Sequence, residues 1–108
     1  MMYGLRAVER QGDMRDQVRM QLGERRRICI SVTSCNRQPF EVTSAKYVLR
    51  VGSETESSGE CELEQKSDSE VILSVVIQPQ RKNTIYTLEY TYEIPPEILI
   101  HDVSVSVY

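Results

Sequence analysis

Strict alternation of apolar and polar residues is the main pattern in the second half of this chain. The clearest case is TIYTLEYTYEI, residues 84–94, where Tyr86, Leu88, Tyr90, Tyr92 and Ile94 share one side of an extended chain. A period of two is typical of a β-strand with one buried face. The same period over 28–33, 45–51 and 98–107 predicts three further strands.

Two other segments are predicted strands of a different character. Residues 60–64 place Cys61 and Leu63 on one face and glutamates on the other, which suits a strand with one solvated face. Residues 71–77, VILSVVI, are apolar at nearly every position, so we expect a central or covered strand. Residues 52–59, GSETESSG, are expected to be a loop or hairpin turn, because glycine and serine favour turns.

The region before residue 27 admits two interpretations. Val18, Met20 and Leu22 alternate, as in a seventh strand that turns at Gly23, but the same stretch could be a helix capped by Asp13. We favour the strand, because an isolated helix this short has little stability of its own. Residues 1–16 are expected to be an N-terminal arm.

These short strands, separated by turns, predict an all-β fold: an immunoglobulin-like antiparallel β-sandwich of about seven strands over residues 17–108. Tyr86 lies two residues before Leu88 in the next-to-last strand, which is where such folds carry a structural tyrosine corner. The tyrosines of residues 84–94 are expected to pack in the core, and a ligand platform is the alternative.

Charge is unevenly distributed along the chain. Residues 1–27 hold seven arginines and four acids, net +3, whereas the remainder holds six basic and twelve acidic residues, net −6. The strongest basic cluster is Arg25, Arg26 and Arg27. In a chain of net charge −3 it favours contact with an acidic neighbouring subunit at least as well as nucleic acid, and no nucleic-acid partner is expected.

Catalytic chemistry is not expected. The single histidine, His101, shares a face with Leu99 and Val103, and Cys61 lies in a core-facing register where a thiol is inert, so the two make a poor nucleophile–base pair. The cysteines lack zinc-ligand spacing, and the acidic run from Glu54 to Glu64 suits a solvated strand face better than a calcium loop. We therefore expect no enzyme, no metal and no cofactor.

Localisation follows from what the composition lacks. No stretch approaches the ~20 apolar residues of a membrane span, and the N-terminus has no signal-peptide core. Cys29, Cys35 and Cys61 are odd in number and irregularly spaced, as expected of free thiols. The chain is expected to be cytoplasmic when made, with the virion as a further location.

Several short elements together resemble a known family. They are Gly12-Asp13, Ala45-Lys46-Tyr47-Val48-Leu49, Ser58-Gly59-Glu60, Pro79 and Tyr86-Thr87-Leu88-Glu89-Tyr90. This order is similar to that of the immunoglobulin-like prophage proteins of Gram-positive bacteria, which are related in pattern to the N-terminal domain of the phage baseplate upper protein. The resemblance spans about residues 12–107 and implies a non-enzymatic virion or assembly component. It implies no catalytic residue.

The expected function is therefore protein–protein contact, in a homo-oligomer or with other phage structural subunits. The candidate interface comprises Ile72 and Val76 on the outer face of their strand, beside Val48 and Ile100 if those strands are neighbours, because apolar residues on a solvated face need cover. Packing beneath the N-terminal arm would explain them equally well. A module that recognises cell-surface carbohydrate is the alternative function.

Overall fold

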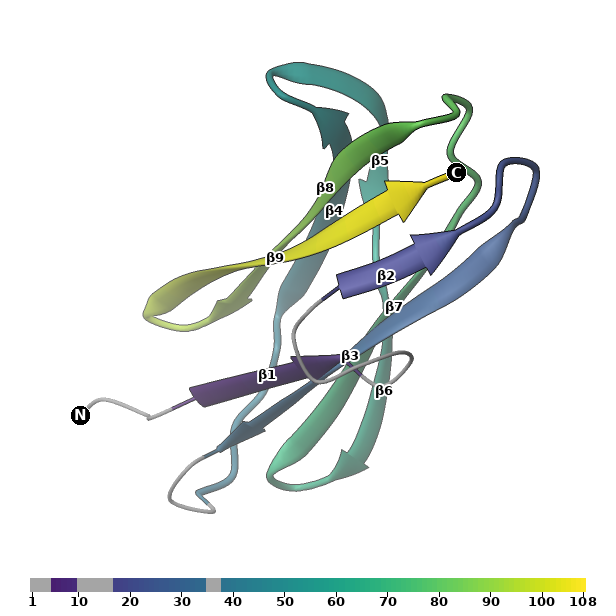
Figure 1. Ribbon diagram of the computed structural model, residues 1–108. Helices are drawn as coiled ribbons and strands as arrows, with labels where there is room; N and C mark the ends of the chain where they lie inside the picture. Colours follow the sequence, from purple (N-terminus) through teal and green to yellow (C-terminus); the bar gives the residue numbers. More distant parts are fainter. Residues whose placement is uncertain (1–4, 10–16, 35–37) are drawn as a thin grey trace.

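Two β-sheets pack face to face in the computed structural model, which describes residues 5–9, 17–34 and 38–108 (Figure 1). Nine strands lie in these residues: β1 Leu5–Glu9, β2 Gln17–Met20, β3 Arg26–Ser34, β4 Ser44–Val51, β5 Glu54–Glu60, β6 Glu62–Ser67, β7 Glu70–Ile77, β8 Thr84–Ile94 and β9 Glu97–Val107. Sheet A has the order β1-β3-β7-β6, and sheet B has the order β2-β9-β8-β4-β5. The prediction of an all-β sandwich is confirmed. No helix long and apolar enough to cross a membrane occurs in the described part of the chain.

The core lies between the sheets and consists of the apolar positions that alternate along the strands. Ile28, Ile30 and Val32 of β3 face inward from sheet A, and Leu88 of β8 and Val103 of β9 face them from sheet B. All of these side chains are fully buried. β7 lies between β3 and β6, so the apolar run of residues 71–77 belongs to an interior strand, as predicted.

The N-terminal region differs in part from expectation. Residues 5–9 form β1, which pairs antiparallel with β3, so they belong to sheet A and not to an arm. The remainder of the expected arm, and the Asp13 position of the helical alternative, lie outside the described residues. The strand over 17–20 is confirmed as β2, and it pairs in parallel with β9, which makes one pair of the sandwich parallel.

Residues 54–60 form a strand where a loop was expected. The turn is confined to Gly52 and Ser53, with Gly52 at φ 58°, a left-handed conformation that glycine adopts easily. β5 then pairs with β4 as the edge of sheet B. An edge strand buries little, so ETESSGE carries no apolar alternation by which the strand could have been predicted.

Candidate interaction surfaces

The four apolar residues predicted to share an interface lie on opposite faces of the sandwich. Val48 on β4 and Ile100 on β9 belong to the outer face of sheet B, separated by β8. Ile72 and Val76 on β7 belong to the outer face of sheet A. One shared patch depended on these strands being neighbours, and that condition is not met, because β7 lies in a different sheet from β4 and β9.

Only one residue of the sheet A pair is available for contact. Ile72 is 5% exposed, between Ser31 of β3 and Glu64 of β6, whereas Val76 is 43% exposed. A single exposed valine on a sheet face is ordinary for a soluble protein. The outer face of sheet A is thus a poor candidate for a large interface.

The three arginines have different environments. Arg26 pairs with Glu24 at 3.2 Å, and Arg27 pairs with Glu62 at 2.7 Å while also donating to Ser74 Oγ at 3.1 Å. Arg25 is exposed in the segment that leads into β3. Of the cluster, Arg25 is therefore the cation most open to another molecule, since the other two are engaged within the chain.

The outer face of sheet B carries the most exposed isoleucines. Ile98 and Ile100 project from β9 with 67% and 64% of their surface exposed, and Ile85 on β8 is 69% exposed at the other end of the sheet. Ile100 was predicted to belong to the interface, whereas Ile98 was not. The signal was present in ILIHDVSVSVY, where Ile98 and Ile100 occupy the same side as Asp102, Ser104 and Ser106.

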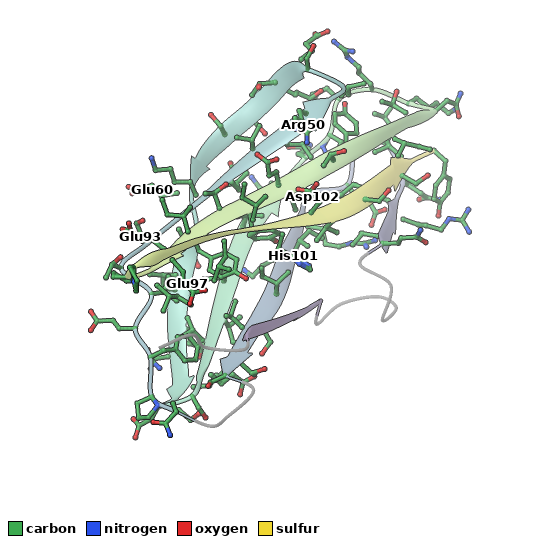
Figure 2. The ribbon with its side chains drawn as sticks, turned by 90° about the vertical axis from the view of Figure 1, so that its left-hand side faces the viewer. Arg50, Glu60, Glu93, Glu97, His101 and Asp102 are labelled. Carbon is green, nitrogen blue, oxygen red and sulfur yellow. The ribbon has the colours of Figure 1, made fainter. Side chains whose placement is uncertain are left out.

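Charged residues lie on the same face of sheet B as the two isoleucines. Glu93 on β8 lies opposite Ile98, Asp102 follows Ile100 along β9, and Lys46 and Glu60 are paired across β4 and β5. Figure 2 shows Glu93 at the hairpin end of β8 and β9, Asp102 farther along, and Glu60 on the neighbouring edge. These three carboxylates and one lysine give this part of the face a net charge of −2.

A shallow hollow of about 280 Å³ lies on the same face. It is lined by Ser44, Lys46, Thr91, Tyr92, Glu93 and Ile98. Glu93 Oε1 accepts a hydrogen bond from Thr43 Oγ1 at 3.1 Å, so its carboxylate is held beside the hollow. We call Ile98, Ile100, Glu93, Asp102 and Glu60 the acidic surface.

The lateral edges at β5 and β6 are protected against pairing with another strand. The β4–β5 pair has a register shift between Leu49 and Arg50, and the β6–β7 pair has one between Gln65 and Ser67. Glu56 lies at the β5 irregularity and accepts hydrogen bonds from the Tyr86 hydroxyl at 2.6 Å and the Gln80 N–H at 3.2 Å. Bulges and inward-directed charges are devices that prevent edge-to-edge association, so strand pairing through β5 or β6 is disfavoured.

The tyrosines of β8 are core residues. Tyr86 and Tyr90 are fully buried and Tyr92 nearly so, which confirms packing and excludes an exposed platform on this strand. The Tyr86 hydroxyl accepts the N–H of Arg81 at 3.0 Å, a backbone contact a few residues upstream of the kind expected. The Tyr90 hydroxyl donates to the Ile28 carbonyl at 3.0 Å, joining the two sheets.

Cys61 and His101 are not brought together. Cys61 lies between β5 and β6, with its N–H bonded to the Ala45 carbonyl at 3.0 Å, whereas His101 lies on β9 opposite Tyr90. Strands β8 and β4 separate them. Burial raises the pKa of the Cys61 thiol to about 12, so the thiolate is scarce at neutral pH.

Leu63 is a correction to the predicted core. It is 46% exposed, although its partner across the ladder, Leu73, is fully buried. β6 is an edge strand, so no neighbour covers its far side. Among the described residues, no group of three or more histidine, cysteine or acidic side chains is arranged to hold a metal ion.

Comparison with known proteins identifies the fold only. No family model and no curated protein matches the chain. An engineered protein solved at 1.98 Å superposes with a TM-score of 0.61 at 13% identity, over 99% of this chain and 20% of that one. The CARDB domain of the PF1109 protein from Pyrococcus furiosus, solved in complex with di-metal ions, gives a TM-score of 0.56 at 14% identity, over 98% of this chain and 89% of that domain. The chain is thus an all-β immunoglobulin-like sandwich, and it spans only a fifth of the engineered protein.

Proposed function

We propose that this chain is a non-enzymatic structural module that acts through protein–protein contact, with the outer face of sheet B as its contact surface. The observation that carries the proposal is the pair of adjacent isoleucines, Ile98 and Ile100, each about two-thirds exposed on a regular strand. Adjacent apolar side chains with a polar rim are typical of interaction sites.

The blocked lateral edges support the same proposal. Strand addition at β5 or β6 would meet a register irregularity and outward glutamates, whereas the middle strands of sheet B offer a continuous surface. Cys61 is unsuited to nucleophilic chemistry at neutral pH for the reason given above. The assignment to a phage or prophage particle rests on the resemblance of short elements described under "Sequence analysis", and the proposed partner is a second copy of this chain.

The test is the mass of the purified chain in solution, measured by sedimentation equilibrium for the wild type and for Ile98→Asp. We expect the wild type to associate as its concentration rises and Ile98→Asp to associate at least ten-fold more weakly, because a buried carboxylate is costly. Val76→Asp is the matched control, since it makes the same change at an exposed residue of the other sheet.

Two results would overturn the proposal. A wild-type chain that remains monomeric throughout would remove self-contact, and Val76→Asp weakening association as much as Ile98→Asp would move the contact to sheet A. The phage assignment is tested separately, by whether the chain co-sediments with intact particles in a density gradient.

A further inference from the structure

A second exposed apolar surface lies at the opposite end of β9 from the two isoleucines. Leu22, in the turn after β2, and Tyr108, after the end of β9, are 45% and 46% exposed. Their backbones are joined, since the Leu22 N–H donates to the Tyr108 carbonyl at 2.9 Å and the Tyr108 N–H donates to the Met20 carbonyl at 3.0 Å. Together with Gln21, Lys82 and Asn83 they line an open hollow of about 510 Å³.

This end of the molecule is basic. Arg19 lies over the Tyr108 ring, with 5.1 Å between the guanidinium carbon and the ring centroid. Arg25 and Lys82 are exposed in the connections β2–β3 and β7–β8, which are joined where the Gln78 side chain donates to the Gly23 carbonyl at 3.4 Å. Arg26 and Arg81 are also at this end, but Glu24 and Glu54 pair with them. Glu56 lies there as well, since it accepts the Gln80 N–H at 3.2 Å, so five cations against three carboxylates give a net charge of +2. We call Leu22, Tyr108, Arg19, Arg25 and Lys82 the basic tip.

The two surfaces are complementary in chemistry and separated in space. The acidic surface presents two isoleucines among carboxylates, and the basic tip presents a leucine and a tyrosine among cations. Ile98 and Tyr108 are ten residues apart on one extended strand, a span of about 33 Å, so the surfaces cannot meet within one chain. Figure 1 shows the β8–β9 hairpin and the C-terminus at opposite ends of β9.

Contact of the acidic surface with the same surface of a second copy is disfavoured by charge. It would set Glu93 and Asp102 against identical carboxylates, and like charges placed together at an interface oppose association. Contact of the acidic surface with the basic tip of a second copy places opposite charges together and apolar side chains against apolar side chains. One chain thus carries both halves of a complementary pair.

We infer that copies of this chain associate head to tail, with the basic tip of one docked on the acidic surface of the next. A contact between two different surfaces is heterologous, so it leaves one surface of each kind free and propagates into a ring or a filament. This inference rests on the proposed function and adds the identity of the second surface. It gives Arg25, named from the sequence, a place in the contact.

The test mixes two variants that each lack one surface. Ile100→Asp disables the acidic surface, and Leu22→Asp disables the basic tip, whereas Val76→Asp disables neither. We expect each of the first two to be monomeric alone. An equimolar mixture should give a complex of roughly 25 kDa, twice the 12.5 kDa of one chain, because each variant supplies the surface that the other lacks.

The outcomes distinguish this inference from the proposed function. If Leu22→Asp associates like the wild type while Ile100→Asp does not, the contact involves sheet B alone, and only the head-to-tail arrangement fails. If the mixture remains monomeric while the wild type associates, the arrangement fails as well. A wild type that never associates contradicts both. Circular dichroism of each variant establishes that a loss of association is not a loss of fold.

Discussion

At the scale of single residues, the hydroxyl of Tyr86 organises one end of the sandwich. It accepts the Arg81 N–H and donates to Glu56, so one buried group connects β8, the loop before it and β5. Tyr86 itself could be predicted from its position before Leu88. Glu56 could not, because its inward position depends on the irregular register of β5, which no local pattern encodes.

Replacement of Tyr86 by phenylalanine should lower the free energy of unfolding by about 1–2 kcal/mol. The change leaves the Arg81 N–H and the Glu56 carboxylate without that partner in a partly buried site. Urea denaturation measures the effect. Tyr108→Phe is the control, since the same atom is removed from an exposed ring. Equal stability of the two variants would contradict the role given to the hydroxyl.

Cys61 should make stability fall at alkaline pH. Its pKa is raised by burial from 9.0 to about 12, so the unfolded thiol ionises before the folded one, and stability is full below about pH 9 and is lost as pH rises toward 12. Burial also raises the pKa of Tyr92, and burial and the hydrogen bond to Glu56 raise the pKa of Tyr86. Both tyrosines therefore also lower the stability at alkaline pH.

The measurement is urea denaturation from neutral pH to about pH 11 in the presence of a reductant. Above about pH 9 the thiol ionises in the unfolded chain but not in the folded one. Cys61→Ala should retain a smaller decline, owing to the tyrosines. A wild type whose stability does not fall above about pH 9, or a Cys61→Ala chain with an identical decline, would show that the thiol is not desolvated in the fold.

At the scale of elements, strands that bury a face could be predicted, whereas of the two exposed edge strands β6 was predicted in part, over residues 60–64, and β5 was not. β3 and β8 alternate because one of their faces meets the core, and β7 is apolar almost throughout because Ile72 on its outer face is also buried, between β3 and β6. β5 and β6 are edge strands with almost wholly exposed side chains, so their sequences are polar, and β5 resembled a loop. Edge strands are specified by the ladder they join and not by their own pattern.

The glutamates of β6 should keep this edge from pairing with other chains. The double variant Glu62→Val/Glu64→Val is expected to aggregate during refolding at concentrations where the wild type remains clear, because it presents a continuous apolar edge strand. Light scattering during dilution from urea measures this. Glu41→Val, an exposed position outside any strand, is the control and should refold like the wild type. If the double variant refolds without aggregation, the bulge and the twist of β6 protect this edge from pairing without the charges.

At the scale of the whole molecule, the two candidate surfaces depend on topology. The basic cluster and the apolar residues 98 and 100 can be found in the sequence. The sequence does not show that they lie toward opposite ends of β9, or that Val48 and Val76 belong to different sheets. Long-range pairing decides which alternating faces share a surface. This is why the structure divides the predicted interface, while the predicted core is confirmed except at Leu63.

The mass of the wild-type chain in solution, followed against concentration at two salt concentrations, tests the central claim most directly. We expect the weight-average mass to rise above 12.5 kDa with concentration at about 50 mM NaCl and to rise less at about 500 mM, because salt screens the contact between acidic and basic surfaces. A constant mass of 12.5 kDa under both conditions would contradict the claim that this chain acts by assembling with itself.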